Sequence, residues 1–220
     1  MAVAFDAVSS GQAAAASSQT ISHTCTGANL VLYVITGGWD GTGRSITVTY
    51  AGVSMTQIAD SDLSLGNDRT WLFRLVAPAT GSNNVVVTIT GGNMHIRTGN
   101  LSFTGAHQSV FDTPQTTVPN NTTTASDTFT SAVGDMVVYG ASVGNDDPHT
   151  ATDALTERYD LNGSGQGEGA AGGTAAGAAS VVVTINWDVT GSAATAGVNI
   201  NAAAADVVFV TRPQRPMPLI

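Results

Sequence analysis

The chain has 220 residues, of which 42% are hydrophobic and only 10% are charged, and its net charge is −9 at pH 7. That length is enough to bury a substantial core. The acidic balance argues against a nucleic-acid-binding protein, because a phosphate backbone must be met by clustered cations. Lysine is absent and Glu157 and Glu168 are the only glutamates, so the residues that build surface helices are scarce. Valine, threonine, glycine, serine and asparagine favour strands and turns, and their abundance predicts an all-β protein.

Cys25 is the only cysteine, so no disulfide can form within the chain. Met1–Ser18 has neither a basic leader nor a long apolar segment, and it does not resemble a secretory signal peptide. No apolar run approaches the roughly 18 residues that a membrane-spanning helix needs. We therefore expect a protein that is made and folded in a reducing cytoplasm and that does not bind membranes.

Strand-like runs recur along the whole chain with turn residues between them. Two of them, Leu30–Ile35 and Met136–Tyr139, are apolar at every position, which indicates central strands that are covered on both faces or make a subunit contact. In chain order, the predicted strands are Val3–Ala7, Gln19–Thr24, Asn29–Thr36, Ser45–Tyr50, Val53–Ala59, Thr70–Ala77, Asn84–Thr90, Met94–Phe103, Ser126–Thr130, Asp135–Val143, Leu155–Tyr159, Ala179–Trp187, Ala196–Asn201 and Asp206–Thr211.

The sequence Val-Val-Val-Thr-Ile occurs twice, at 85–89 and at 181–185. Other landmarks repeat in the same order around it, which favours an internal repeat over the alternative, a coincidence in a chain rich in valine and threonine. Leu30–Tyr33 precedes the first copy as Met136–Tyr139 precedes the second. Between these runs and the two copies lie Met55–Gln57 and Leu155–Glu157, and after the two copies come Leu101–Phe103 and Val198–Ile200. This order predicts an antiparallel two-sheet β-sandwich of jelly-roll type built from two diverged halves, at about 19–111 and 126–210. Residues 1–18 are expected to form an N-terminal arm and the first strand.

Three segments stand apart from these predicted strands. Residues 112–125 contain two prolines and few hydrophobic residues, which is typical of a surface loop joining the two halves. Residues 163–177 are mostly glycine and alanine, and they fit either a mobile loop or a strand that a neighbour can approach closely. Residues 211–220 carry three prolines and the paired Arg212 and Arg215, so they are expected to form an extended tail.

The tail ends in an apolar run, and it contains two of the seven arginines of an acidic chain. This combination indicates a segment that docks on another surface, although a disordered terminus has the same composition. The candidate contact residues in the tail are Arg212, Pro213, Arg215, Pro216, Met217, Pro218, Leu219 and Ile220.

The sequence carries no recognisable catalytic constellation. The four histidines lack metal-ligand spacing, and Cys25 lies in a context typical of a small buried residue. His149 follows two aspartates, but such a cluster is more often a solvated turn, and Asp60–Asp68 lacks the pattern of a calcium-binding loop although a loose one is an alternative. Asp188, beside Trp187, is the only acid that resembles a glycosidase carboxylate. We therefore expect no enzyme activity, no cofactor and no metal site.

Trp39 is the one aromatic residue set in a glycine loop, and Asp40 and Arg44 flank it. An exposed tryptophan beside polar side chains is a platform on which sugar rings stack. The same residue could instead cap the core or contact a neighbouring subunit. Trp39, Asp40 and Arg44 are therefore the candidate residues for glycan or partner contact, whereas Trp71 and Trp187 are predicted to be core residues.

Several of these runs resemble a family of phage and bacterial jelly-roll proteins. The resemblance is carried by Asn29–Ile35, Ser45–Thr56, Thr70–Pro78, Val85–Ile89 and Leu101–Ala106, and it extends over about residues 20–210. Members of that family are virion surface proteins, such as head decoration or fibre proteins, and bacterial extracellular modules.

The resemblance implies a non-enzymatic virion protein, most simply a capsid decoration protein that binds the outer surface of the head lattice. Its implied partners are the major capsid protein and sister subunits, with a homotrimer as the expected assembly. The N-terminal segment Met1–Ser18 and the tail are the expected contacts. The alternative is a carbohydrate-binding or host-adhesion module that uses the Trp39 loop.

Overall fold

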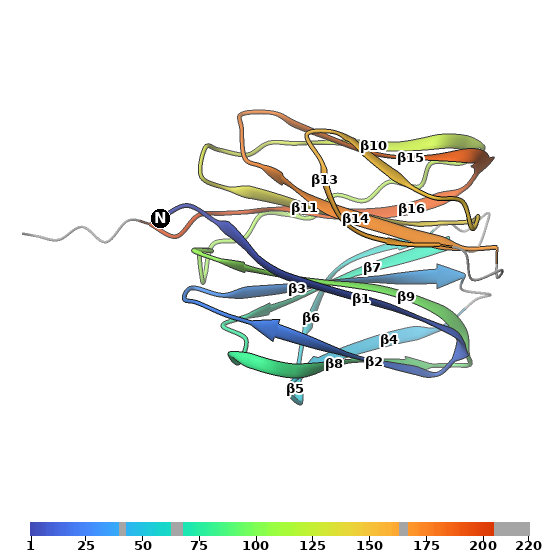
Figure 1. Ribbon diagram of the computed structural model, residues 1–220, viewed down its shortest axis with the longest axis horizontal. Coiled ribbons are helices and arrows are strands. Elements are labelled where there is room, and N and C mark those ends of the chain that lie inside the picture. The colour runs from blue at the N-terminus through green and yellow to red at the C-terminus, as the bar shows by residue number, and fades with distance from the viewer. Residues whose placement is uncertain (40–42, 63–67, 163–166, 205–220) are drawn as a thin grey trace, which may run out of the picture.

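The computed structural model describes residues 1–39, 43–62, 68–162 and 167–204, and every regular element in these ranges is a β-strand. The strands form four antiparallel sheets that stack as four layers (Figure 1). The structure thus confirms an all-β protein of antiparallel, sandwich-like construction. It contains four sheets where the sequence predicted two, and the jelly-roll type remains a prediction.

Residues 4–104 form the lower two layers in Figure 1. The first inner sheet has the order β1-β9-β3-β7-β6, and the first outer sheet has the order β2-β8-β4-β5. The strands are β1 (Ala4–Ala16), β2 (Ser18–Cys25), β3 (Val31–Trp39), β4 (Ser45–Tyr50), β5 (Val53–Ser54), β6 (Thr56–Asp62), β7 (Asp68–Val76), β8 (Gly81–Thr90) and β9 (Met94–Thr104).

Residues 122–200 form the upper two layers. The second inner sheet has the order β13-β14-β11-β16, and the second outer sheet has the order β10-β15-β12. The strands are β10 (Thr122–Phe129), β11 (Met136–Val143), β12 (Thr150–Asp153), β13 (Thr156–Leu161), β14 (Gly169–Ala176), β15 (Val181–Gly191) and β16 (Ala193–Ile200).

The two sandwiches have the same strand order. The order β9-β3-β7-β6 in the first corresponds to β16-β11-β14-β13 in the second, and β2-β8-β4 corresponds to β10-β15-β12. The predicted half-repeat is therefore visible in the topology. However, each half forms a complete sandwich of its own, because each half has enough strands to build two sheets with a core between them.

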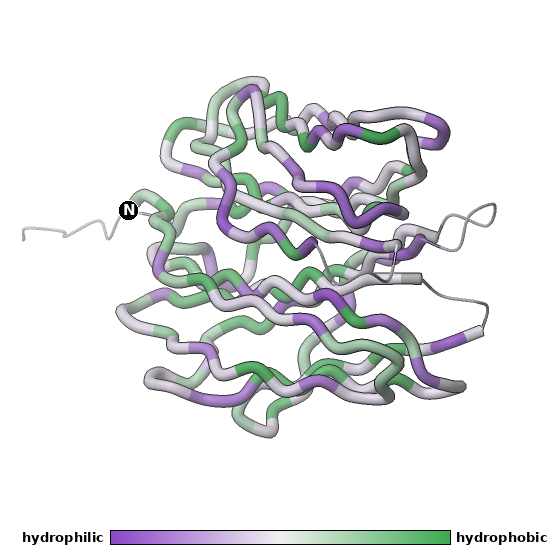
Figure 2. Tube along the Cα trace, turned by 45° about the vertical axis from the view of Figure 1, so that its right-hand side comes forward, coloured by the Kyte–Doolittle hydropathy of each residue, from purple (hydrophilic) through white to green (hydrophobic). Residues whose placement is uncertain are grey.

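The repeated pentapeptide occupies equivalent places in β8 and β15. Val85, Val87 and Ile89 lie in the first core, and Val181, Val183 and Ile185 lie in the second core. Val86 and Val182 point outward between them. Figure 2 shows this alternation of hydrophobic and hydrophilic residues along the strands. Because successive side chains of a strand alternate between its two faces, the same sequence buries the same three positions in both strands.

The predicted equivalence of Leu30–Tyr33 and Met136–Tyr139 is wrong by one residue. Tyr33 lies between the two inner sheets, whereas Tyr139 lies in the second core. The residue of β11 that shares the orientation of Tyr33 is Val138. Successive side chains of a strand point to opposite faces of the sheet, so a shift of one residue pairs side chains from different faces. Tyr33 and Tyr139 are therefore not equivalent positions.

The inner sheets pack face to face and form a third apolar cluster between the sandwiches. Val31, Tyr33 and Leu101 contribute to it from below, and Val138 and Val198 contribute from above. Both β3 and β11 are covered on both faces, as their uninterrupted apolar sequences predicted.

The glycine-rich segment 163–177 includes β14, an interior strand of the second inner sheet. A Cβ atom at Gly172 would lie 2.6 Å from the Tyr159 ring, and one at Gly99 would lie 2.1 Å from the same ring. Of the two alternatives for this segment, a strand that allows close approach is the one found for residues 169–176. Tyr159 fills the space that these glycines leave between the sandwiches.

Residues 112–125 are not a free loop. Gln115 exchanges backbone hydrogen bonds with Gly197 at 2.9 and 3.0 Å, and the carbonyls of Thr117 and Pro119 accept from β16, so this segment extends the second inner sheet beyond β16. It corresponds to β1, which extends the first inner sheet beyond β9. β1 itself is much longer than the predicted Val3–Ala7, and the strand predicted at 206–211 lies outside the described residues.

Candidate functional site

Both described chain ends meet at one end of the molecule, which we call the termini end. It comprises residues 1–3, 105–112, 131–135 and 199–203, and it lies on the left in Figure 1. The amino group of Met1 donates to the carbonyl of Ala203 at 2.9 Å. The amide of Ala203 donates to the carbonyl of Gly105 at 2.8 Å, and Val3 bonds to Gly134 at 2.7 Å. The last described residues are thereby fixed beside the N-terminus.

Two carboxylates organise the termini end. The side-chain amide of Asn199 donates to Asp112 Oδ2 at 2.8 Å and to Asp135 Oδ2 at 3.1 Å. Asp135 Oδ1 accepts from the backbone amide of Ala202 at 2.8 Å, and Asp112 Oδ1 accepts from Asn201 at 3.1 Å. Hydrogen bonds to charged acceptors are stronger than neutral ones. The path of the chain toward its C-terminus is therefore set as far as Ala203.

Large apolar side chains are exposed at the same end. Met1 is 65% exposed, Val110 is 52% exposed and Val133 is 94% exposed. They belong to three separate segments that the hydrogen bonds above bring together. Exposed large apolar side chains at one end of a molecule are candidates for an interaction surface.

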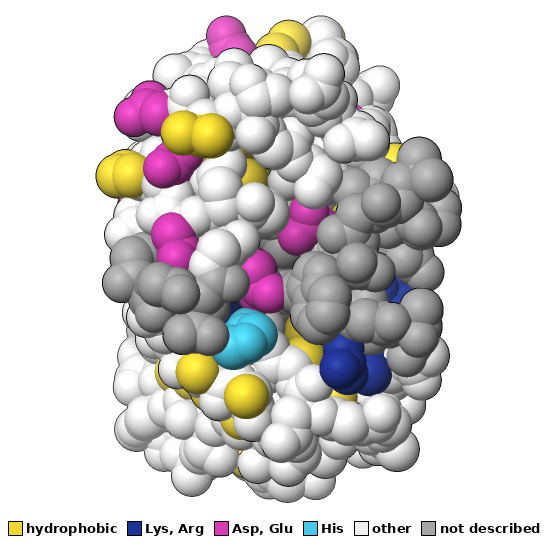
Figure 3. All heavy atoms as spheres, turned by 90° about the vertical axis from the view of Figure 1, so that its right-hand side faces the viewer, with side chains coloured by type: hydrophobic (Ala, Val, Ile, Leu, Met, Phe, Trp, Pro, Cys, Tyr) yellow, Lys and Arg dark blue, Asp and Glu magenta, His cyan; other side chains and the backbone are white. Residues whose placement is uncertain are grey.

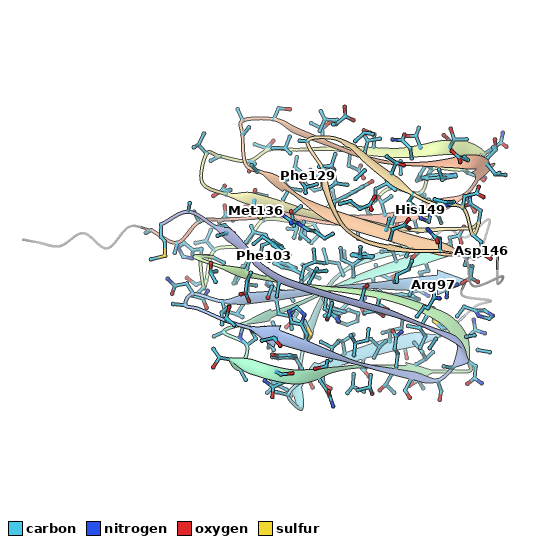
Figure 4. The ribbon with its side chains drawn as sticks, viewed as in Figure 1. Arg97, Phe103, Phe129, Met136, Asp146 and His149 are labelled. Carbon is cyan, nitrogen blue, oxygen red and sulfur yellow. The ribbon has the colours of Figure 1, made fainter. Side chains whose placement is uncertain are left out.

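The opposite end, which we call the loop end, holds a group of buried charges (Figure 4). Arg97 is only 1% exposed, and its Nη2 donates to the carbonyl of Glu168 at 3.1 Å. The Asp146 carboxylate accepts from the amides of Gly167 at 2.9 Å and of Glu168 at 3.2 Å. Burial lowers the pKa of Arg97, and the nearby carboxylates of Glu168 and Asp146 oppose that change. Arg97 thus connects β9 of the first sandwich to the second.

A histidine and an aspartate form a hydrogen-bonded pair at this end. His149 Nδ1 lies 2.7 Å from Asp160 Oδ1, and Asp160 Oδ2 accepts from the side-chain amide of Asn162 at 2.7 Å. A carboxylate that orients an imidazole is also part of many catalytic sites. Here the His149 side chain has no exposed surface and packs against Gly169, where a Cβ would lie 2.4 Å from Cε1. The geometry is that of a structural pair, and sequence reasoning missed it because Asp160 is eleven residues from His149.

The two aspartates before His149 bind backbone rather than forming a site with it. Asp147 accepts from the amide of Val189 at 2.9 Å, and Asp146 binds the backbone at 167–168 as described above. Within the described ranges, no group of three or more histidine, cysteine or acidic side chains is arranged to hold a metal ion. In the Asp60–Asp68 segment, Asp60 pairs with Arg69 at 2.7 Å, and residues 63–67 lie outside the described part.

Trp39 is the last residue of β3, at the loop end, and its side chain lies outside what the structure describes, as does Asp40. Arg44 is half-buried and lies beside Gly91 and Gly92. The predicted contact residues of the tail, Arg212–Ile220, are also outside the described residues. Of the predicted contact residues, the structure therefore places Met1–Ser18, Arg44 and the backbone of Trp39.

The predicted core residues are where the sequence indicated. Trp71 is buried in the first core and Trp187 in the second, where its Nε1 donates to the carbonyl of Thr122 at 3.0 Å. Cys25 is fully buried in the first core, and burial raises the pKa of its thiol. The predicted core positions of Trp71 and Trp187 are confirmed.

The fold and the two ends define a tandem antiparallel β-sandwich protein whose first and last described residues are hydrogen-bonded to each other at one end. No family model, curated protein or solved structure matches this chain. No helix long and apolar enough to cross a membrane occurs among the residues that the structure describes.

Proposed function

We propose that this protein is a non-enzymatic structural component of a virion, and specifically a decoration protein that binds the outer surface of a phage head. The observation that carries the proposal is the termini end. There the described chain ends beside Met1, at an end of the molecule that exposes Met1, Val110 and Val133. The residues that follow, which include Arg212–Ile220, are joined to this end, so the two parts can contact one partner.

The termini end and the tail would each supply a different kind of contact to the partner. The termini end exposes the apolar side chains of Met1, Val110 and Val133, and the tail combines Arg212 and Arg215 with an apolar terminus. Each contact would be small, but a capsid lattice presents the same site many times. Linked weak contacts then reach a high overall affinity through effective concentration. The major capsid protein and sister subunits are the proposed partners, and the head surface is the proposed location.

Deletion of Arg212–Ile220 tests the role of the tail. We expect the truncated protein to keep its melting temperature and to lose most of its occupancy on purified heads, measured by quantitative electrophoresis of sedimented particles. The double variant Arg212→Ala/Arg215→Ala separates charge from length, and we expect it to have intermediate occupancy. Undiminished occupancy of the truncated protein would remove the tail from the proposal.

The location itself is tested by asking whether the protein co-purifies with assembled particles. A decoration protein is present in a fixed copy number per head, since it occupies a lattice. Absence from washed particles, or a copy number that varies between preparations, would contradict the proposal.

A second candidate function is glycan binding through Trp39, Asp40 and Arg44. It is favoured by the position of β3, which ends at the loop end, opposite the termini end. A molecule attached to a head by the termini end would present the end of β3 outward. Binding on a glycan array that Trp39→Ala abolishes would support this function, with Trp71→Phe as a control for a buried tryptophan.

A further inference from the structure

The N-terminal strand β1 forms a long open edge of the first inner sheet. It has 13 residues, and among the described residues it pairs on one side only, with β9. None of its residues is buried, and Figure 1 shows it running across the side of the molecule that faces the viewer. Asp6 is its only charged residue, and that carboxylate is engaged by the amide of Thr26 at 2.9 Å and by the hydroxyl of Ser102 at 2.7 Å.

An open edge strand is a template for pairing, and proteins usually block it with charges, prolines, brevity or a covering segment. Four of the other described edge strands follow this rule. β13 carries Glu157, Arg158 and Asp160, β6 carries two aspartates, and β5 and β12 have two and four residues. β2, the edge of the first outer sheet beside β1, carries no Asp, Glu or Arg either.

The internal repeat supplies a direct comparison. Residues 115–119 take the place of β1 in the second sandwich, on the edge of β16. That segment is short and lies between Pro114 and Pro119, which cannot donate hydrogen bonds. Two equivalent edges of one molecule therefore differ: one is short and flanked by prolines, and the other is long, without proline and almost without charge.

We infer that β1 pairs with β1 of a second copy of this chain, antiparallel and about a two-fold axis, so that the first inner sheets of two molecules become one continuous sheet. The regular part of β1 lies between its two register shifts, from Ala7 to Ala13, and its midpoint is Ser10. Pairing centred on Ser10 places Ala7 opposite Ala13 and Val8 opposite Gln12. These side chains are small or uncharged, so the strand is complementary to itself.

The charges are compatible with this register. The two Asp6 side chains lie at opposite ends of the paired strands, about 27 Å apart at about 3.4 Å per residue. That separation is well beyond the roughly 8 Å over which charges interact at physiological salt. The chain's own tail is a poor partner for this edge. Pro213, Pro216 and Pro218 lack backbone N–H groups, and they occur at both odd and even positions, so either side of an extended tail would lack donors.

The inference does not depend on binding to a capsid, and it gives a two-fold dimer in place of the homotrimer that the sequence suggested. A two-fold contact uses the same patch on both molecules and closes at two subunits. The axis lies perpendicular to the shared sheet, so the two acidic second sandwiches lie on the same side of it. Their repulsion should be screened by salt, and we expect the dimer to tighten as NaCl rises from about 20 to 300 mM.

Sedimentation of the full-length chain at several concentrations tests the pairing. We expect a dimer that Ser10→Lys weakens at least tenfold, because an exposed lysine on an edge opposes strand pairing. Thr116→Lys places the same charge on the equivalent, proline-flanked edge and should leave the dimer unchanged. A monomer at all concentrations, a trimer, or a dimer that Ser10→Lys does not affect would overturn the inference.

A cross-link tests the register without a disruptive charge. Ser10→Cys places two thiols opposite each other across the axis, where directly opposed Cβ atoms are about 4.5–5.5 Å apart. We expect oxidation to yield a covalent dimer, with buried Cys25 unreactive in the parent protein. Ser18→Cys, at the start of β2, is the control and should cross-link far less. Equal cross-linking of both variants would contradict a register centred on Ser10.

Discussion

At the scale of single residues, Asp68 shows how burial at the sandwich junction changes the chemistry of a side chain. Asp68 begins β7 in the first sandwich and is almost fully buried. It accepts a hydrogen bond from the hydroxyl of Ser192, which belongs to the second sandwich. Burial raises its pKa to about 6, and the hydrogen bond from Ser192 opposes this rise.

This pKa predicts a pH dependence of stability. The folded protein holds the Asp68 proton up to about pH 6, whereas the unfolded chain releases it near 3.8. The folded state therefore binds more protons between these values, and the free energy of unfolding should fall as pH rises from about 4 to 6, by about 3 kcal/mol. Above pH 6 the loss is complete.

Asp68→Asn should abolish this loss, since the amide keeps an acceptor for Ser192 and carries no charge. We expect urea unfolding to show a more stable variant at pH 7.5, by about 1–3 kcal/mol, and little difference at pH 4. Asp188→Asn, at an exposed aspartate, is the matched control. Equal stability of Asp68→Asn and the parent protein at pH 7.5 would contradict the assignment.

At the scale of elements, β8 and β15 show one sequence used twice for one purpose. Both strands are central in their outer sheets, and each lies between two partners. Val87 and Val183 have no exposed surface, whereas Val182 is 40% exposed and Val86 is half-buried. The contribution of each valine to the free energy of unfolding should therefore depend on the face of the strand that it occupies, and not on its neighbours in the sequence.

Truncation of the paired valines tests this relation. Val87→Ala and Val183→Ala should each lower the free energy of unfolding by about 2 kcal/mol, since they remove buried methyl groups and leave a cavity. Val86→Ala and Val182→Ala should each cost less than about 0.5–1 kcal/mol. Chemical denaturation measures all four, and equal costs for the two faces would contradict the alternation.

At the scale of the whole molecule, charge is divided between the sandwiches. Residues 1–104 contain five acidic residues and four arginines, whereas residues 105–204 contain ten acidic residues and a single arginine. Figure 3 shows acidic side chains mainly on the upper half of the loop end and basic ones on the lower half. The apolar cluster between the inner sheets joins these unlike halves.

That cluster should make the two sandwiches unfold together. Trp71 reports on the first core and Trp187 on the second, so single-tryptophan variants follow each sandwich by fluorescence. We expect coincident transitions, because the interface is continuous with both inner sheets. Two separated transitions would show that the sandwiches are independent.

Gly99→Ala tests the interface itself. A Cβ at this position would lie 2.1 Å from the Tyr159 ring, so we expect a loss of about 1–3 kcal/mol that appears equally with both tryptophan probes. Gly52→Ala, where nothing lies within 4 Å but the backbone φ is +79°, is a control for strain without a clash. A loss confined to one probe would contradict the coupling.

The amino-acid sequence was sufficient to predict the secondary structure class and the repeat. Its valine and threonine alternation required strands, and the two copies of Val-Val-Val-Thr-Ile identified β8 and β15 as equivalent. It also identified Trp71 and Trp187 as core residues. These features are local, because side-chain periodicity and residue type are properties of short segments.

The tertiary structure alone decided how the halves are arranged. Strand alternation does not reveal whether two halves share two sheets or build four, since that choice depends on which distant strands pair. It also decided that His149 meets Asp160, that Asp112 and Asp135 fix the chain beside Met1, and that β1 remains an open edge while residues 115–119 extend β16. Each of these contacts depends on the folding of segments onto one another, which no short stretch of sequence encodes.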